Sequence, residues 1–166
     1  LRKRLRGYAE ARSAPCAPAE GHASGLSPYL HFGHVSIEEI VEAALATTGK
    51  WSPDELRLHN RGKREGFFCD DPDVNSFLDE ALTWRELAHN YVYHNPKHRT
   101  WAGVPSWAQQ ELDDHAADPR PVLYGDDDLE HARTHDDLWN ACQRSLLRDG
   151  ELHNYLRMLW GKAVLQ

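Results

Sequence analysis

The stretch that decides the fold is DVNSFLDEALTWRELAHNYVY, residues 73–93. Its apolar residues recur at spacings of three and four, which is the period of an amphipathic helix and not of a strand. The positions that form this stripe are Val74, Phe77, Leu78, Ala81, Leu82, Ala88 and Val92. The pattern predicts one helix from about Asp73 to Tyr93, the longest in the chain.

Two helix-start signals precede this stretch. Ser36 and Glu39 have the spacing of a capping box, and the apolar stripe that follows predicts a helix over 36–48. The residues expected to face inward are Ile37, Ile40, Val41, Ala44 and Leu45. Ser52-Pro53-Asp54-Glu55 repeats the signal, with proline at the first helical position.

Three further helices are predicted after it. Ser106 with Gln109 opens a helix around 107–115, and Thr134 with Asp137 opens another that Gly150 ends. The last helix covers about 151–166, and its expected inward residues are Leu152, Tyr155, Leu156, Leu159 and Ala163. Loops are expected at 14–25, 67–71, 95–105 and 118–128. With no convincing strand alternation, the fold is predicted to be all-α.

The last predicted helix has no stop signal. Its end, WGKAVLQ at 160–166, stays in helical register with no glycine, proline or cap after it. We therefore expect the parent protein to continue beyond Gln166.

Length and composition bound the remaining possibilities. The 166 residues suffice for one domain with a core, and 40% of them are hydrophobic. No run of about 20 apolar residues and no signal-peptide pattern is present, so no membrane partner is expected. Cys16, Cys69 and Cys142 are odd in number and lack CxxC spacing. They indicate a reducing, cytoplasmic compartment, with idle or buried thiols.

Net charge is −7, which argues against nucleic acid until its distribution is considered. Between Glu111 and Asp137 lie ten acidic residues and two arginines, which leaves 16 acidic against 17 basic residues elsewhere. A local basic face can attract phosphates on an acidic protein. The run LRKRLR at 1–6 is one such cluster, although it also fits a solvated helix face.

The first segment with chemical potential is SGLSPYLHFG, residues 24–33. Serines that flank a glycine before a turn offer hydroxyls and backbone N–H groups, which suit a phosphate or pyrophosphate. Such stretches are more often plain loops, so on the residues alone both interpretations stay open.

The second segment is EALTWREL, residues 80–87. Glu80, Trp84 and Tyr91 are predicted to share one helix face, while Arg85 lies about 140° round the axis from Glu80. A carboxylate beside a stacking ring is a way to hold a flipped base. The alternative is a core tryptophan with solvated Glu80 and Arg85.

Two more segments are rich in polar and aromatic residues, at 134–143 and 150–162. Asn154 and Met158 are one turn apart, and Arg157 stands three residues before Trp160. The chain has six tryptophans, and core packing explains most of them without a function.

Together these segments resemble the photolyase/cryptochrome family, in its C-terminal FAD-binding helical domain. SGLSPYLHFG resembles the family's phosphate-cradling signature, and EALTWREL its substrate-and-flavin helix. PSWAQQEL, HDDLWNACQ and GELHNYLRMLWGK are similar to the class II cyclobutane pyrimidine dimer photolyases. The motifs stand in family order from about Tyr8 to the last residue. The resemblance therefore implies that residues 1–166 are a partial FAD-binding catalytic domain.

The resemblance also implies a set of site residues. Those that would bind FAD are Tyr8, Ser24, Gly25, Leu26, Ser27, Arg85, Asn90 and Arg157. Those that would hold the extruded dimer as catalytic residues are Glu80, Trp84 and Met158. Trp139 and Trp160 match the pair that passes an electron to oxidised flavin, and no metal is implied.

The implied activity is light-dependent repair of UV-damaged DNA, in which excited reduced FAD donates an electron that opens the cyclobutane ring. Asn154 follows His153 where class II members more often have glycine, which departs from the subclass pattern. The family's α/β antenna domain is absent from the chain. We therefore expect the fragment alone to be inactive, and the full-length parent to be an active, monomeric deoxyribodipyrimidine photolyase.

Two alternatives remain at this point. The first is a cryptochrome-like flavin photoreceptor without repair activity on the same fold, against which Glu80, Trp84 and Met158 speak. The second is a metal-binding or interaction module, suggested by eleven histidines. His31 and His34 are close, as are others near residue 94, but no cysteine or carboxylate completes a tetrahedral set.

Overall fold

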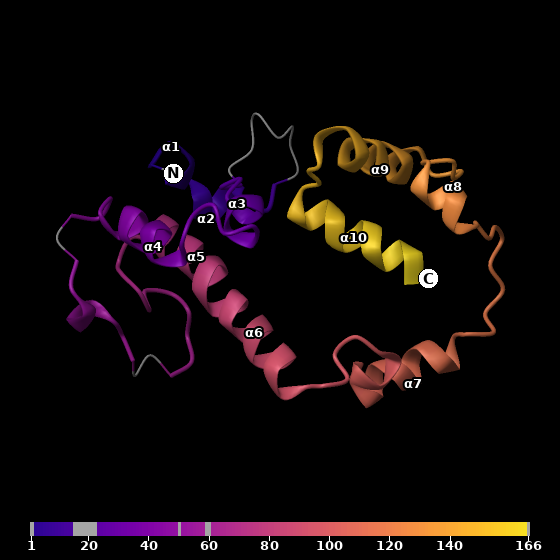
Figure 1. The fold of residues 1–166 in the computed structure, drawn as a ribbon, viewed down its shortest axis with the longest axis horizontal. Coiled ribbons are helices and arrows are strands. Elements are labelled where there is room, and N and C mark those ends of the chain that lie inside the picture. Colours follow the sequence, from indigo (N-terminus) through magenta and orange to yellow (C-terminus); the bar gives the residue numbers. More distant parts are fainter. Residues whose placement is uncertain (1, 15–22, 50, 59–60, 166) are drawn as a thin grey trace.

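The computed structural model describes residues 2–14, 23–49, 51–58 and 61–165. These residues form helices and no strand, which confirms the predicted all-α fold (Figure 1). The α-helices are α1 (Arg2–Leu5), α2 (Tyr8–Ala11), α3 (Ser27–His31), α4 (Ile37–Leu45), α5 (Pro72–Leu78), α6 (Arg85–His94), α7 (Ser106–Asp114), α8 (Asp126–Glu130), α9 (Asp137–Asp149) and α10 (Asn154–Leu165). Between them lie two 3₁₀ turns, η1 (Pro53–Glu55) and η3 (Trp101–Gly103), and one π-helical segment, η2 (Asp79–Trp84).

The predicted long helix is the rod α5–η2–α6, which runs diagonally through the centre of Figure 1. Asp71 caps its start, because the Asp71 carboxylate accepts hydrogen bonds from the backbone N–H groups of Asp73 and Val74. The interior is not uniform, since η2 has the wider i→i+5 turn of a π-helix. The regular α period behind the predicted common face of Glu80, Trp84 and Tyr91 therefore does not hold across η2.

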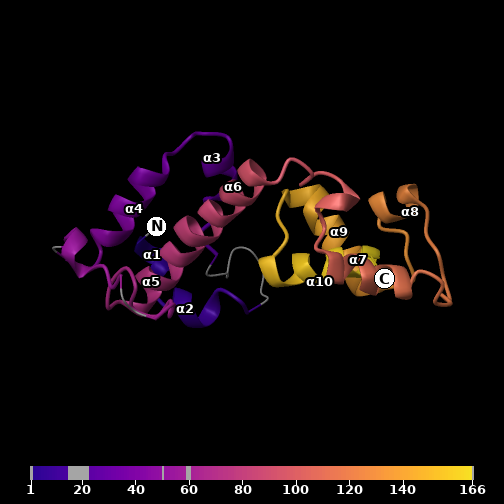
Figure 2. The ribbon, with the colours of Figure 1, turned by 90° about the horizontal axis from the view of Figure 1, so that it is seen from below.

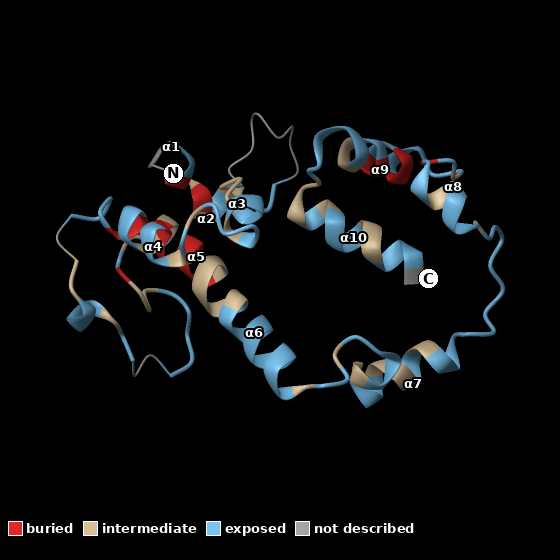
Figure 3. Cartoon of the chain, viewed as in Figure 1, coloured by how far each residue is buried: buried red, intermediate tan, exposed pale blue. Residues whose placement is uncertain are grey.

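The main core surrounds α5. Its buried residues come from α1, α2, α4, α5 and the segment before α5, and they are Leu5, Tyr8, Ile40, Ala44, Leu45, Cys69, Val74, Phe77 and Leu78. Figure 3 shows this buried cluster around the α4–α5 crossing. The ring of Tyr8 meets that of Phe77 edge to face, with centroids 5.6 Å apart. The capping box predicted at Ser36 and Glu39 is confirmed and starts α4.

Asp79, the first residue of η2, is the last buried residue of the rod. None of the residues of α6 is buried, so the predicted inward stripe is wrong at Ala88 and Val92. The rod leaves the core here, because the main contacts of α1, α2 and α4 with the rod are made to α5.

The apolar face of α10 is also largely uncovered. The expected inward residues Tyr155, Leu159 and Ala163 are exposed, while Leu152 and Leu156 are half-buried. The prediction fails here because α10 packs against α9 along one side, and the described residues leave its other sides open (Figure 3).

Helices α8 to α10 form a second group beside the first, as Figures 1 and 2 both show. Helix α9 buries Trp139, Asn140, Cys142 and Gln143. It ends at Gly150, whose φ of 68° is the left-handed conformation that the prediction of a glycine stop requires.

Several predicted helix starts were displaced. Thr134 does not cap α9; Asp136 does, and it accepts from the backbone N–H groups of Leu138 and Trp139. Ser106 likewise makes no cap and is the first residue of α7. The start signal at 52–55 yields only η1, because Leu56 is extended with ψ of 124° and ends the turn.

Some predicted loops contain helix. Helix α8 begins inside the expected loop at 118–128, η3 lies inside 95–105, and α3 lies inside the segment 24–33. Loop 67–71 is confirmed as non-helical. Most of the expected loop 14–25 lies outside the described residues, as does Cys16. Cys69 and Cys142 are free thiols, and burial raises the pKa of both.

Candidate functional site

Tyr8 and Glu80, two of the predicted site residues, meet at the contact between α2 and η2. Arg12 Nη1 lies 2.8 Å from Glu80 Oε1, in an ion pair whose side chains are 23% and 35% exposed. The pKa of Tyr8 is raised, mainly because the phenol is buried. The nearby Arg12 guanidinium acts to lower this pKa, and the Glu80 carboxylate acts to raise it. The Glu80 carboxylate is thus held at the edge of the core beside a buried phenol and a guanidinium.

Asp73 of α5 fixes the position of α2. Its two carboxylate oxygens accept hydrogen bonds from the backbone N–H groups of Gly7, at 2.7 Å, and Ala9, at 2.9 Å. A carboxylate at a helix N-terminus satisfies donors that have no partner within the helix. This contact holds Tyr8 and Arg12 in place against α5 and η2.

The predicted phosphate segment forms a tight turn before α3. Leu26 N–H donates to Ser24 Oγ at 3.3 Å, and Gly25 has a φ of 70°. Arg4 lies beside the turn, because its Nη1 donates to the Ala23 carbonyl at 2.7 Å and is 3.9 Å from where a Cβ of Gly25 would stand. A guanidinium next to a serine-glycine turn is a suitable setting for a phosphate.

Of the site residues predicted on the rod after Glu80, Trp84 and Asn90 are exposed and Arg85 is half-buried. The side chain of Trp84 is not in the core, since the residue is 51% exposed. Arg85 makes an ion pair at 3.3 Å with Glu86, which follows it in α6. Asn90 lines a shallow hollow on α6 together with Thr83. All these side chains are therefore accessible to a ligand.

Trp139 and Trp160 stack face to face. Their ring centroids are 5.4 Å apart and their planes differ by 10°. The Trp139 indole N–H also points to the Trp160 carbonyl, with Nε1 and O 3.4 Å apart. The two tryptophans predicted as an electron-transfer pair thus lie in direct contact, one on α9 and one on α10.

Arg157 and Met158 are not brought to Glu80 and Trp84. Both are exposed on α10, and Met158 is 57% exposed. Helix α10 packs on α9, and Figures 1 and 2 show it apart from α6. The described residues therefore form three separate parts of the predicted site: the Glu80 cluster, the Ser24–Ser27 turn and the tryptophan stack.

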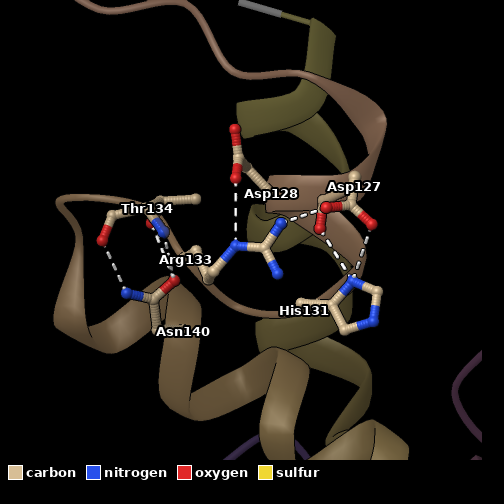
Figure 4. A network of polar contacts seen from close by, with 6 residues as sticks. All are labelled: Asp127, Asp128, His131, Arg133, Thr134 and Asn140. Carbon is tan, nitrogen blue, oxygen red and sulfur yellow. Dashed lines mark hydrogen bonds and ion pairs between the residues drawn. The ribbon is translucent and has the colours of Figure 1, made fainter.

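Arg12 and Asp73 were not expected as partners of these parts, and Arg4 was expected only as a member of the basic run at 1–6. Each contacts a segment that is distant in sequence, and no local motif marks such a contact. Another unexpected group fixes the corner between α8 and α9 (Figure 4). Arg133 pairs there with Asp127 and Asp128, while Asn140 binds Thr134.

The described residues show neither a metal site nor a membrane-spanning helix. No group of three or more histidine, cysteine or acidic side chains is arranged to hold a metal ion in that part of the chain. No helix there is both long and apolar enough to cross a membrane.

Comparison with known proteins gives one consistent result. No protein-family model matches the chain. The deoxyribodipyrimidine photo-lyase of Oryza sativa subsp. japonica is 37% identical over all 166 residues, and that of Arabidopsis thaliana is 36% identical over the same length. The deoxyribodipyrimidine photo-lyase of Methanothermobacter thermautotrophicus is 34% identical, also over the whole chain.

The chain spans 29% of the length of the two plant relatives and 31% of the archaeal one. The similarity thus covers all of this chain and less than a third of each relative. The motif-based recognition is confirmed: the whole chain is similar to one segment of the deoxyribodipyrimidine photo-lyases.

Proposed function

We propose that the protein to which this chain belongs is a light-dependent DNA repair enzyme, a deoxyribodipyrimidine photolyase that splits cyclobutane pyrimidine dimers. The observation that carries this proposal is the stack of Trp139 on Trp160, with centroids 5.4 Å apart. Two parallel indoles in contact suit the passage of an electron between α9 and α10. The whole-chain similarity to proteins named deoxyribodipyrimidine photo-lyase supports the same activity.

The implied cofactor is FAD, and the residues present fit it in two places. The turn at Ser24, Gly25, Leu26 and Ser27 has hydroxyls, a left-handed glycine and the Arg4 guanidinium, which suit a diphosphate. Asn90 and Arg157 are exposed and Arg85 is half-buried, so all three could approach the rest of the molecule. When bound, FAD would supply light-driven one-electron chemistry, which no protein side chain supplies.

The chain's own residues would hold the substrate. A pyrimidine dimer must leave the DNA stack before chemistry, and the half-exposed indole of Trp84 offers it a stacking surface. Glu80 would hydrogen-bond the pyrimidine edge. Because Glu80 is paired with Arg12, the Arg12 guanidinium would hold the carboxylate in position until the substrate arrives. Met158 is exposed on α10, apart from Glu80 and Trp84, and would line the same pocket only if α10 approached them.

Residues 1–166 would then be part of the FAD-binding catalytic domain. The partner would be UV-damaged DNA, the compartment one that contains DNA, and the full-length protein a monomer. In this proposal, Tyr8 packs under the site through its contact with Phe77 and supports Glu80 from the core side.

The decisive experiment is a blue-light repair assay on the full-length protein, with DNA that carries one thymine dimer. Glu80→Gln keeps the shape of the side chain but removes its charge. Loss of a hydrogen bond to a charged group corresponds to a roughly 10- to 100-fold lower repair rate. Glu42→Gln, at an exposed position of α4, is the matched control and should repair as wild type.

Flavin content must be the same in the three proteins for the comparison to hold. A wild-type protein that photoreduces its flavin and leaves dimers intact would overturn the repair function and favour a photoreceptor. Equal repair by Glu80→Gln and wild type would remove Glu80 from the substrate site.

A further inference from the structure

Two buried side-chain atoms in the described part of the chain have no hydrogen-bond partner there. They are Trp160 Nε1, which is a donor, and Gln143 Oε1, which is an acceptor. A buried polar group without a partner lowers stability, so such groups are rarely left unpaired in folded proteins. The indole N–H of Trp160 could donate a hydrogen bond to the amide oxygen of Gln143.

The orientation of the Gln143 amide is fixed by its other end. Gln143 Nε2 donates to the Glu130 carbonyl at 3.0 Å, and the residue is 7% exposed. Turning the amide over would place Oε1 against that carbonyl and lose the bond. Oε1 is therefore the atom left free to accept.

Gln143 also stands beside the tryptophan stack. It follows Trp139 by four residues on α9, so the two side chains are neighbours on one helix face, with Cβ atoms about 5–6 Å apart. The Trp160 ring is stacked on the ring of Trp139, the neighbour of Gln143 on α9. Trp139 is not the donor that Gln143 Oε1 lacks, because its own indole N–H already reaches the Trp160 carbonyl.

We propose that Gln143 is the positioning residue of Trp160: its Oε1 accepts the Trp160 indole N–H, directly after a small side-chain adjustment or through one water. This inference rests on the proposed function, in which Trp160 gives an electron to photoexcited oxidised flavin. Loss of that electron leaves a positive charge on the indole, and an acceptor at Nε1 stabilises it. An amide oxygen is too weak a base to remove the proton, so Trp160 stays a radical cation.

The proton and electron balance gives the test its spectroscopic readout. In wild type the electron moves from Trp160 to the flavin, and the Nε1 proton stays in place until Trp139 refills the hole. In Gln143→Glu a carboxylate stands at the same position, and it takes the Nε1 proton as the electron leaves. The product there is the neutral tryptophan radical, whose absorption differs from that of the cation.

The experiment uses the full-length flavin-loaded protein and transient absorption after a blue flash. Gln143→Met, which fills the site without an acceptor, should slow flavin photoreduction about tenfold. Gln143→Glu should give the neutral radical in place of the cation. The control Gln110→Met, at an exposed position of α7, should match wild type in rate and spectrum. Wild-type rate in Gln143→Met together with an unchanged radical in Gln143→Glu would overturn the proposal.

A second measurement can refute the proposal without any Gln143 variant. The resonance Raman band that reports indole N–H hydrogen bonding can be taken as the difference between wild type and Trp160→Phe. A hydrogen-bonded N–H in wild type that becomes free in Gln143→Met supports the assignment, and a free N–H in wild type refutes it. A parent protein that binds no flavin would instead refute the proposed function, and the Raman result would still decide the Gln143–Trp160 contact.

Discussion

Helices α5 and α6 belong to one rod, but they have opposite environments. In α5, Val74, Phe77 and Leu78 are each less than 5% exposed, whereas none of the residues of α6 is buried. Both halves continue the same apolar pattern. The difference is in their neighbours: α1, α2 and α4 pack on α5, and the chief neighbour of α6 is η2. Apolar periodicity therefore marks the residues that can be buried, while burial itself requires a second element.

The largest test of this contrast replaces one leucine in each half. Leu78 is fully buried, so Leu78→Ala should lower the free energy of unfolding by about 2–5 kcal/mol through the cavity that it leaves. Leu87 on α6 is 54% exposed, and Leu87→Ala should change it by about 0.5 kcal/mol or less. Urea denaturation measures both. Equal losses would show that α6 is covered in the protein under test.

A smaller effect is expected from the polar contacts of the two halves. Asp73→Asn weakens two bonds from α5 to the backbone of α2 and should cost about 2 kcal/mol. The matched change on α6 is Glu86→Gln, which breaks a surface ion pair and should cost about 0.5 kcal/mol or less. If thermal unfolding shows the same shift for both variants, the anchoring of α2 by Asp73 is not what stabilises this region.

The smallest effect concerns pH at the buried end. Burial raises the pKa of Tyr8, so the folded protein keeps the phenolic proton where the unfolded chain loses it. This contribution to stability is complete below the unfolded pKa of about 10, and it is lost as pH rises through the folded value. Tyr8→Phe should therefore lose less stability than wild type between about pH 8 and pH 11. Parallel losses in denaturant titrations at the two pH values would contradict this.

The sequence predicted those parts of the fold that depend on local chemistry. The capping box at Ser36, the stop at Gly150 and the extent of the rod were all readable, because each is decided by residues a few positions apart. The uncovered sides of α6 and α10 were not, because exposure depends on what packs there. Thr134 misled in the same way, since its hydroxyl binds Asn140 and Asp136 caps α9 instead.

In the candidate site, too, the motifs identified residues but not the contacts between them. The resemblance named Glu80 and the tryptophans, but it gave no information on which of them touch. The structure adds the contact of Trp139 with Trp160 and the pairing of Glu80 with Arg12. Neither contact follows from a motif, because each joins side chains on two different helical elements. The assigned roles of these residues remain predictions for the assays above.

The π-helical segment η2 has one further consequence, for how sequences of this kind can change. Each residue of an α-helix turns about 100°, so the wider turn at Asp79–Trp84 sets the rotational phase between α5 and α6. Deleting a single residue there would restore a regular helix and leave α5 seated in its core. The wider turn takes up about one residue more than a regular turn, so α6 would keep nearly its present direction after that deletion. A one-residue gap in this segment would thus change η2 itself, and leave both the core and the surface that carries Asn90 in place.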